Sequence, residues 1–443
     1  MLELFENLVR ADANAPALID AATGAVATRG ALLRRAQSVA NALAAAGLAP
    51  RDPIAVQLPN SVDFVAVFVA ALLRDLVVFP IDRDANEHEV AAILRHFRIR
   101  ALVGRSGIAP LPAAALPLPA AVRLVKLTSG STGLPKGIAV SDANLLADCA
   151  NICATMGIAP HDVNLGAIPF SHSYGFSNLV MPLLAQGTPV VVTNDYLPQA
   201  LVDHANQHRC TVAPLIPMVF DHLARAAHGS FESVRTFISA GAPLPASTSR
   251  RFRERFGIDI HSFYGCSEAG GIAYDRRGGA VERGTVGTAM EGVSLAIDQG
   301  RLRVTSASVA EGQLPEGAAF IPFDGTFTTD DLVELRDGEL SLTGRASDLI
   351  NTAGKKVNPR EVEAVILQIE GVREVKVYGE SAGARGEVVA AAVVAAPDVT
   401  RERVREFCRA RLSLHKVPRV VKLIDAMPVD ERGKVKRAAL TAL

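Results

Sequence analysis

The chain has 443 residues, 49% of them apolar, and its 46 Lys and Arg residues balance its 46 Asp and Glu residues. Because a nucleic-acid-binding surface is basic, this balance argues against a nucleic-acid partner. The five cysteines lack a CxxC spacing, which favours a reducing, cytoplasmic location, and we expect neither a signal peptide nor a membrane span.

Helical patterns alternate with short apolar runs along the first part of the chain. Helices are expected over residues 29–48, 61–75 and 87–97, and strands over 53–58, 77–81 and 99–104. Further strands are expected at 189–193, 211–216 and 236–244, the last of which runs out into a Gly-Ala-Pro turn. This alternation is typical of an α/β fold whose parallel or mixed sheets are flanked by helices. An Ala- and Pro-rich segment, residues 107–122, is expected to be an irregular connector.

The pattern changes near Arg345. Helices are then expected over 359–371 and 400–415, and strands over 373–381, 387–396 and 419–425. The sequence therefore predicts a large N-terminal domain, residues 1–346, and a small C-terminal α+β domain, residues 347–443.

Residues 128–137, TSGSTGLPKG, combine hydroxyl side chains, glycines and one lysine. They follow an expected strand and precede an expected helix at 141–157, so we interpret them as a strand-to-helix loop. Turned-in amides and hydroxyls suit a polyanion such as phosphate. The loop is not Walker A, because Pro135 precedes Lys136 and Gly137 follows it. An ordinary Ser/Gly-rich turn is the alternative.

Three later segments carry further candidate chemistry. His172 lies among aromatic and small residues, and Gly241-Ala242-Pro243 offers bare backbone against which a flat ring could lie. Tyr264 is a stacking platform close to Ser267 and Glu268, a hydroxyl and a carboxylate that suit Mg²⁺ with phosphates. Taken singly, each is more often a structural residue.

The last candidates lie towards the C-terminus. Asp331 and Arg345 could clasp ribose hydroxyls and a phosphate. Lys434 follows a glycine in a basic segment, DERGKVKR, whose simpler interpretation is a basic tail.

Together these segments resemble the adenylate-forming superfamily, which includes acyl-CoA and aryl-CoA synthetases, firefly luciferase and the adenylation domains of peptide synthetases. The similarity runs from about the first helix to the last residues. Its motifs occur in the family's order at Thr128 to Gly137, Tyr264 to Glu268, Gly284 to Gly287, Thr329 to Leu332, Gly344 to Asn351 with Gly354, Glu361 to Glu363, and Gly433-Lys434.

The resemblance implies two half-reactions. A carboxylate and ATP with Mg²⁺ give acyl-AMP and pyrophosphate, and a thiol of CoA or of a carrier protein's phosphopantetheine then gives the thioester. Glu268 would bind the metal, Lys434 would bridge carboxylate and α-phosphate, and His172 would lie between acyl pocket and thiol tunnel. ATP would be held by Thr128, Ser129, Gly130, Ser131, Thr132, Gly133, Lys136, Gly241, Ala242, Pro243, Tyr264, Gly265, Ser267, Asp331 and Arg345.

The resemblance also implies a mobile C-terminal lid domain that turns about a hinge at Ser347 and Asp348, with Gly354 beside the thiol tunnel. A fatty or aromatic acid is expected, because Ser171 stands where amino-acid-activating relatives have an Asp that pairs with the substrate ammonium. The acyl pocket would be lined by His172, Phe176, Gly241, Gly265, Gly270, Gly271 and Ile272.

Two residues depart from the family pattern. Asp330 stands where a Gly is usual, and Ser347 stands where the hinge acid is usual. They leave open a nucleotide-binding protein without turnover, although Glu268 and Lys434 argue against it. A ligase that loads a carrier protein is the other alternative, and a homodimer is left open.

Overall fold

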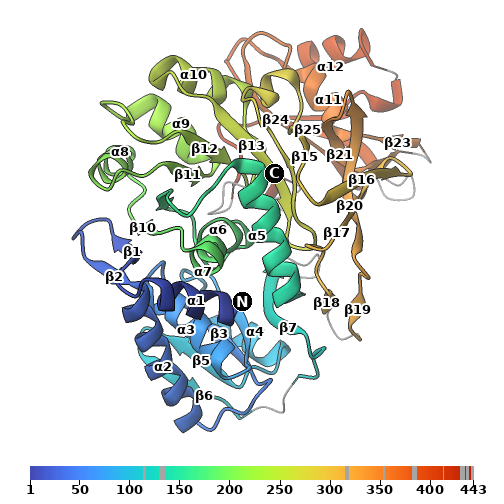
Figure 1. Ribbon diagram of the computed structural model, residues 1–443. Coiled ribbons are helices and arrows are strands. Elements are labelled where there is room, and N and C mark those ends of the chain that lie inside the picture. Colours follow the sequence, from blue (N-terminus) through green and yellow to red (C-terminus); the bar gives the residue numbers. More distant parts are fainter. Residues whose placement is uncertain are drawn as a thin grey trace. The chain divides into compact units, whose positions relative to one another are not determined.

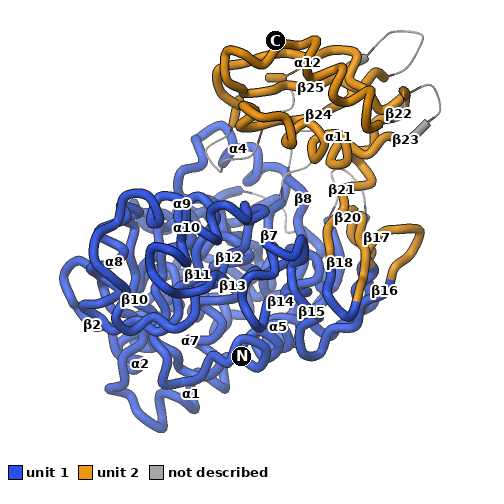
Figure 2. Tube along the Cα trace, turned by 90° about the horizontal axis from the view of Figure 1, so that it is seen from above, with its two compact units in different colours: residues 1–296, 303–327, 337–340 blue, residues 297–302, 328–336, 341–443 orange. Residues whose placement is uncertain are grey.

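The computed structural model (Figure 1) describes residues 1–112, 116–128, 135–314, 319–352, 355–381, 387–412, 414–429, 435 and 439–440. The chain forms two compact units (Figure 2). Unit 1 comprises residues 1–296, 303–327 and 337–340, and unit 2 comprises residues 297–302, 328–336 and 341–443. The boundary predicted after residue 346 falls within unit 2, and as the limit of a moving domain it stays a prediction.

Unit 1 contains a first sheet of mixed direction, in which β3, β4, β5 and β7 run parallel. Every residue of β3 and β4 is buried, as expected for parallel strands covered on both faces. In spatial order the strands are β19 (Ile321–Pro322), β18 (Gly312–Leu314), β8 (Lys136–Ser141), β7 (Val122–Thr128), β4 (Val77–Pro80), β3 (Pro53–Val56), β5 (Ala101–Gly104) and β6 (Gly107–Pro110).

The second sheet of unit 1 is parallel from β1 to β13 and antiparallel at β2, β14 and β15. Four further strands, β16 (Val293–Asp298), β17 (Arg301–Ser306), β20 (Thr326–Arg336) and β21 (Glu339–Arg345), have residues in both units. In spatial order the strands of unit 1 are β15 (Thr288–Ala289), β14 (Gly270–Tyr274), β13 (Ile260–Cys266), β12 (Thr236–Ser239), β11 (Val212–Leu215), β9 (Asn164–Gly166), β10 (Val190–Val192), β1 (Pro16–Asp20) and β2 (Val26–Thr28).

The helices of unit 1 begin at residues suited to capping. Ser61 and Ser141 accept the amides of Phe64 and Asn144 at the starts of α3 and α5. None of the described helices combines the length and apolar character that a membrane span requires. The helices are α1 (Leu2–Ala11), α2 (Arg29–Ala45), α3 (Val62–Leu73), α4 (Glu87–His96), α5 (Asp142–Met156), α6 (Ser173–Gly175), the π-helix η1 (Phe176–Val180), α7 (Met181–Gln186), α8 (Pro198–Gln207), α9 (Pro217–Ala226), α10 (Ala246–Phe256) and the 3₁₀-helix η2 (Ala280–Arg283).

Unit 2 has its own apolar core, in which Val362 and Ile366 of α11 pack with Val377, Val393 and Val404. This matches the α+β pattern expected from residues 359–425. Its remaining elements are η3 (Ala346–Asp348), β22 (Ile350–Thr352), β23 (Lys355–Val357), α11 (Pro359–Ile366), β24 (Val372–Ser381), β25 (Glu387–Ala395), α12 (Arg401–Arg409), η5 (Leu414–Lys416) and β26 (Val420–Leu423).

Two local predictions were wrong. The stretch after residue 128 does not lead directly into a helix, because β8 pairs antiparallel with β7 before α5 begins. Gly137 looks like a loop residue, but a Cβ there would lie 2.8 Å from Val125 Cγ1, so the glycine instead allows close core packing. The expected connector at 107–122 also begins as a strand, since β6 forms a hairpin with β5.

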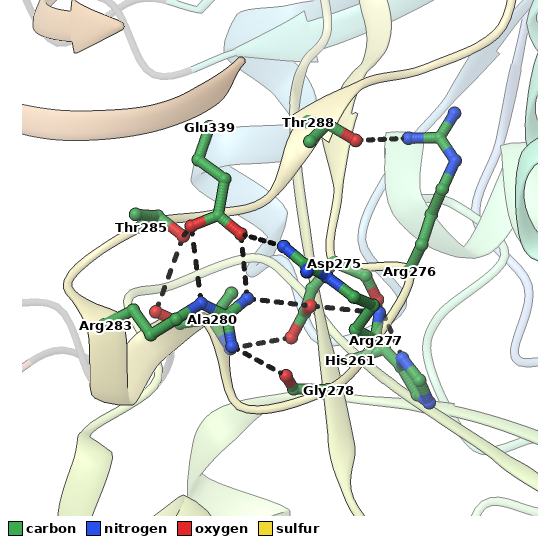
Figure 3. A network of polar contacts seen from close by, with 10 residues as sticks. All are labelled: His261, Asp275, Arg276, Arg277, Gly278, Ala280, Arg283, Thr285, Thr288 and Glu339. Atoms are coloured by element: carbon green, nitrogen blue, oxygen red, sulfur yellow. Dashed lines mark hydrogen bonds and ion pairs between the residues drawn. The ribbon is translucent and has the colours of Figure 1, made fainter. Parts of the chain in front are cut away.

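A polar network in unit 1 explains the Gly284 to Gly287 motif (Figure 3). Glu339, the first residue of β21, accepts hydrogen bonds from Thr285 Oγ1 at 3.0 Å and from Arg283 Nη2 at 2.9 Å. A Cβ on Gly287 would lie 2.2 Å from the Tyr274 carbonyl oxygen, so only glycine fits. The motif therefore holds the start of β21 against η2.

We expect Glu339→Gln to lower the free energy of unfolding by about 1–3 kcal/mol near pH 7. Hydrogen bonding to Arg283 lowers the pKa of Glu339. The ionised Glu339 therefore stabilises the folded protein fully at pH values above its unfolded-state pKa of about 4.3. This stabilisation is lost as the pH falls through the lower pKa of the folded state. Urea unfolding of both proteins from pH 7 to pH 3 measures the difference, which should shrink with acidification.

Glu291→Gln is the matched control, because Glu291 is 65% exposed and pairs with Arg276 at 3.4 Å. Such a surface pair is worth at most about 1 kcal/mol. Equal effects of the two substitutions, or a Glu339→Gln effect that does not depend on pH, would contradict the assignment.

Candidate active site

Three segments of the second sheet leave it at the same edge. Strands β9, β11, β12 and β13 are parallel neighbours, so their carboxyl ends meet at this edge. The His172 segment follows β9, the Gly241-Ala242-Pro243 turn follows β12, and Ser267 and Glu268 follow β13. Ligand sites in parallel sheets form outside these ends.

The first sheet presents a similar edge. Asn60, Asp82 and Thr128 lie at or just beyond the ends of the parallel strands β3, β4 and β7. Thr128 pairs with Lys136 across the β7–β8 ladder, and Lys136 is exposed. Both ends of the predicted phosphate loop are thus adjacent, whereas Ser129, Gly130, Ser131, Thr132 and Gly133 lie outside the described residues.

The His172 segment joins the two edges. His172 Nε2 lies 3.0 Å from Asp82 Oδ2, and the Phe170 amide donates to Asn60 Oδ1 at 2.7 Å. On the other side, the hydroxyls of Ser173 and Ser267 lie 2.7 Å apart. The predicted residues His172 and Ser267 are therefore brought into one region of unit 1.

Glu268 lies near a buried cation. Lys126, on β7, is 6% exposed. Burial lowers its pKa, and the nearby carboxylates of Asp148 and Glu268 act in the opposite direction. Burial also raises the pKa of the Cys266 thiol, so Cys266 is not suited to be a nucleophile.

Asp148, on α5, binds the backbone at the glycine-rich start of β14. Its carboxylate accepts the Ser177 hydroxyl at 2.7 Å and the Gly271 amide at 2.8 Å. A Cβ on Gly270 would lie 2.4 Å from Asp148 Oδ1, and one on Gly265 would lie 2.5 Å from the Gly270 carbonyl oxygen. Close packing within the protein thus accounts for these glycines, and their place in the acyl pocket stays a prediction.

Of the other predicted ligand-binding residues, two from the acyl pocket are buried, and the turn expected to contact adenine is exposed. Phe176 is buried and packs edge-on against Phe68 at 4.9 Å, and Ile272 is fully buried. Gly241 has a φ of +87° in an exposed turn with Ala242 and Pro243, which leaves this backbone open to a ligand.

The predicted ribose and hinge residues all belong to unit 2. Arg345 Nε donates to Asp331 Oδ1 at 3.0 Å, so the two predicted ribose ligands form an ion pair. Asp330 Oδ2 accepts the Ser347 amide at 3.2 Å and also the Ser347 hydroxyl. The two departures from the family pattern therefore contact each other.

Gly354 and Lys434 lie outside the described residues. Four buried or half-buried polar residues close to the predicted site segments were not found from the sequence, namely Asn60, Asp82, Lys126 and Asp148. A lysine between the apolar residues Val125 and Leu127 of the strand VRLVKLT was the one available signal.

Known families, curated proteins and solved structures resemble this chain over most of its length. The model of the AMP-binding enzyme family matches residues 5–127 and 109–314, and that of the AMP-binding enzyme C-terminal domain matches residues 361–434. Among curated relatives, a sulfoacetate–CoA ligase of Cupriavidus necator is 29% identical over 96% of this chain and 94% of its own, and a feruloyl-CoA synthase of an Amycolatopsis species is 27% identical over 93% of both. The crystal structure of ATP-bound MatB from Rhodopseudomonas palustris superposes with a TM-score of 0.84 at 25% identity, over 100% of this chain and 98% of that one.

Proposed function

The chain belongs to the AMP-binding enzyme family, and from this premise we propose that it converts a fatty or aromatic carboxylic acid into a CoA thioester. Its relatives are acid–CoA ligases, and the chain is an AMP-forming ligase of this type. First the carboxylate attacks the α-phosphate of ATP, which releases pyrophosphate and gives acyl-AMP. The thiol of CoA then attacks the acyl carbon, and AMP leaves.

One observation carries this proposal. The phosphate-loop motif begins at Thr128, the last residue of β7, and the motif Tyr264 to Glu268 lies at the end of β13 in the same unit. The His172 segment forms hydrogen bonds at both of these sheet edges. A carboxylate oxygen cannot leave unaided, and transfer to AMP makes it a leaving group. Such chemistry needs positioning and charge neutralisation rather than a nucleophilic side chain.

The residues present suit Mg²⁺. Mg²⁺ is usually bound by one or two carboxylates together with substrate phosphates, and the carboxylate of Glu268 follows β13 at the edge where the phosphates are proposed to bind. Glu268 is the proposed ligand, and the ion would neutralise phosphate charge when bound. Lys136 would face the β- and γ-phosphates, and Lys434 the developing charge between carboxylate and α-phosphate.

The proposed acid is apolar away from its carboxylate. Phe176 and Ile272 are buried hydrocarbon side chains in the predicted pocket region. Ser171 offers no carboxylate to a substrate ammonium, and a desolvated unpaired ammonium would be costly. Free α-amino acids are therefore poor candidates.

The test is pyrophosphate release with a panel of fatty, aromatic and amino acids, each with and without CoA. We expect release with an apolar acid and formation of its acyl-CoA. Acid-dependent release without acyl-CoA would indicate a carrier-protein acceptor instead. No release with any acid would favour a nucleotide-binding protein without turnover.

A further inference from the structure

Contacts other than the one with His172 hold the carboxylate of Asp82 in place. Its Oδ1 accepts the Asp84 amide at 3.0 Å, and Gln57 Nε2 donates to the Ala85 carbonyl at 3.0 Å, which holds the same turn. The second oxygen, Oδ2, lies 3.0 Å from His172 Nε2. The turn after β4 therefore presents an oriented acceptor to the imidazole.

The backbone of the His172 segment is fixed independently. Asn60 is 6% exposed and forms hydrogen bonds with the Phe170 amide at 2.7 Å and the Ile168 carbonyl at 2.8 Å. The Phe176 amide donates to the His172 carbonyl at 2.8 Å, which begins the following helix. Hydrogen bonds therefore fix the backbone that carries the imidazole ring, and Asp82 is the hydrogen-bond partner of the ring.

This arrangement selects one tautomer of His172. An ionised carboxylate only accepts hydrogen bonds, so Nε2 must carry the proton that Asp82 binds. Nδ1 then has the lone pair in the neutral ring, and it makes no hydrogen bond to any described residue. The side chain is 35% exposed, so a substrate can reach it.

We propose that Asp82 is a positioning residue that holds His172 with its proton on Nε2, so that Nδ1 is the nitrogen that acts on the thiol. The inference rests on the proposed function. In the second half-reaction Nδ1 takes the proton of the S–H bond, the sulfur forms a bond to the acyl carbon, and the bond between that carbon and the phosphate oxygen breaks. AMP leaves with the electron pair.

The test measures thioester formation in a single turnover, from enzyme-bound acyl-AMP mixed with CoA. Asp82→Asn should slow this step about 10- to 100-fold, the range found when the hydrogen-bond partner of a metal-binding histidine is removed. In a His172→Gln background the same substitution should change the rate by no more than about twofold, because its effect passes through the ring. Asp203→Asn, at an exposed position of α8, is the matched control and should leave the rate unchanged.

A second measurement needs no Asp82 variant. In protein labelled with ¹⁵N-histidine, the His172 signals, assigned by their loss in His172→Gln, should report Nε2–H. An Nδ1–H tautomer, or equal slowing by Asp82→Asn in both backgrounds, would overturn the inference. Absence of thioester in the unmodified enzyme with every acid would instead refute the proposed function, and the tautomer would still test the role of Asp82.

Discussion

Lys434→Ala should slow acyl-AMP formation by on the order of 10² to 10³ while the variant still converts supplied acyl-AMP into thioester. Negative charge gathers between the carboxylate and the α-phosphate only in the first half-reaction, so the ammonium has no evident role afterwards. Pyrophosphate release and single-turnover thioester formation, measured on the same preparation, separate the two steps.

Gly354→Leu is the counterpart, and we expect it to form acyl-AMP and then stall. The proposed value of Gly354 is space for the pantetheine arm close to the backbone. If both variants remain folded and lose both steps in parallel, the C-terminal domain does not serve the two half-reactions in turn. Both positions lie outside the described residues, so this prediction rests on the family resemblance.

Gly175→Ala should destabilise the protein by about 1–3 kcal/mol and lower the rates of both half-reactions. The φ of Gly175 is −66°, which any residue adopts, but a Cβ there would lie 2.0 Å from the Pro169 carbonyl oxygen. The His172 segment would have to move to relieve this contact. Thermal unfolding and pyrophosphate release measure the two effects.

Gly104→Ala is the control for this substitution. The nearest atom to a Cβ at Gly104 is the Gln57 carbonyl oxygen at 3.9 Å, so the methyl group fits without displacement. A Gly175→Ala protein as stable as Gly104→Ala would show that the Pro169 turn adapts easily and that its geometry does not constrain His172.

Much of the fold could be predicted from apolar periodicity. Strands such as β3, β4 and β11 are short and wholly buried, and amphipathic or capped helices separate them. Strand β8 was missed because Gly137 resembles a turn residue, and its role in packing depends on Val125 across the ladder. Strands β15 to β21 were not found, because their mixed polar composition gave no clear alternation.

From the sequence, candidate site residues could be named only where they form local motifs. Glu268 and Ser267 belong to such a motif, whereas Asp82 and His172 are 90 positions apart. These two residues meet because the segment after β9 of the second sheet reaches the turn after β4 of the first. Asp148 acts through the Gly271 amide, 123 positions away. Spacing along the chain contains no information about such contacts until the topology is known.

The contact between Asp330 and Ser347 matters for anyone who redesigns this enzyme by consensus. Alignment to the family would suggest Gly at one position and an acid at the other, each as an independent correction. Because the Asp330 carboxylate accepts both the amide and the hydroxyl of Ser347, an acid introduced at position 347 alone would face another carboxylate. The residues at positions 330 and 347 should therefore be changed together. A library that varies them independently would mostly contain pairs in which the side chain at 347 cannot donate a hydrogen bond to the one at 330.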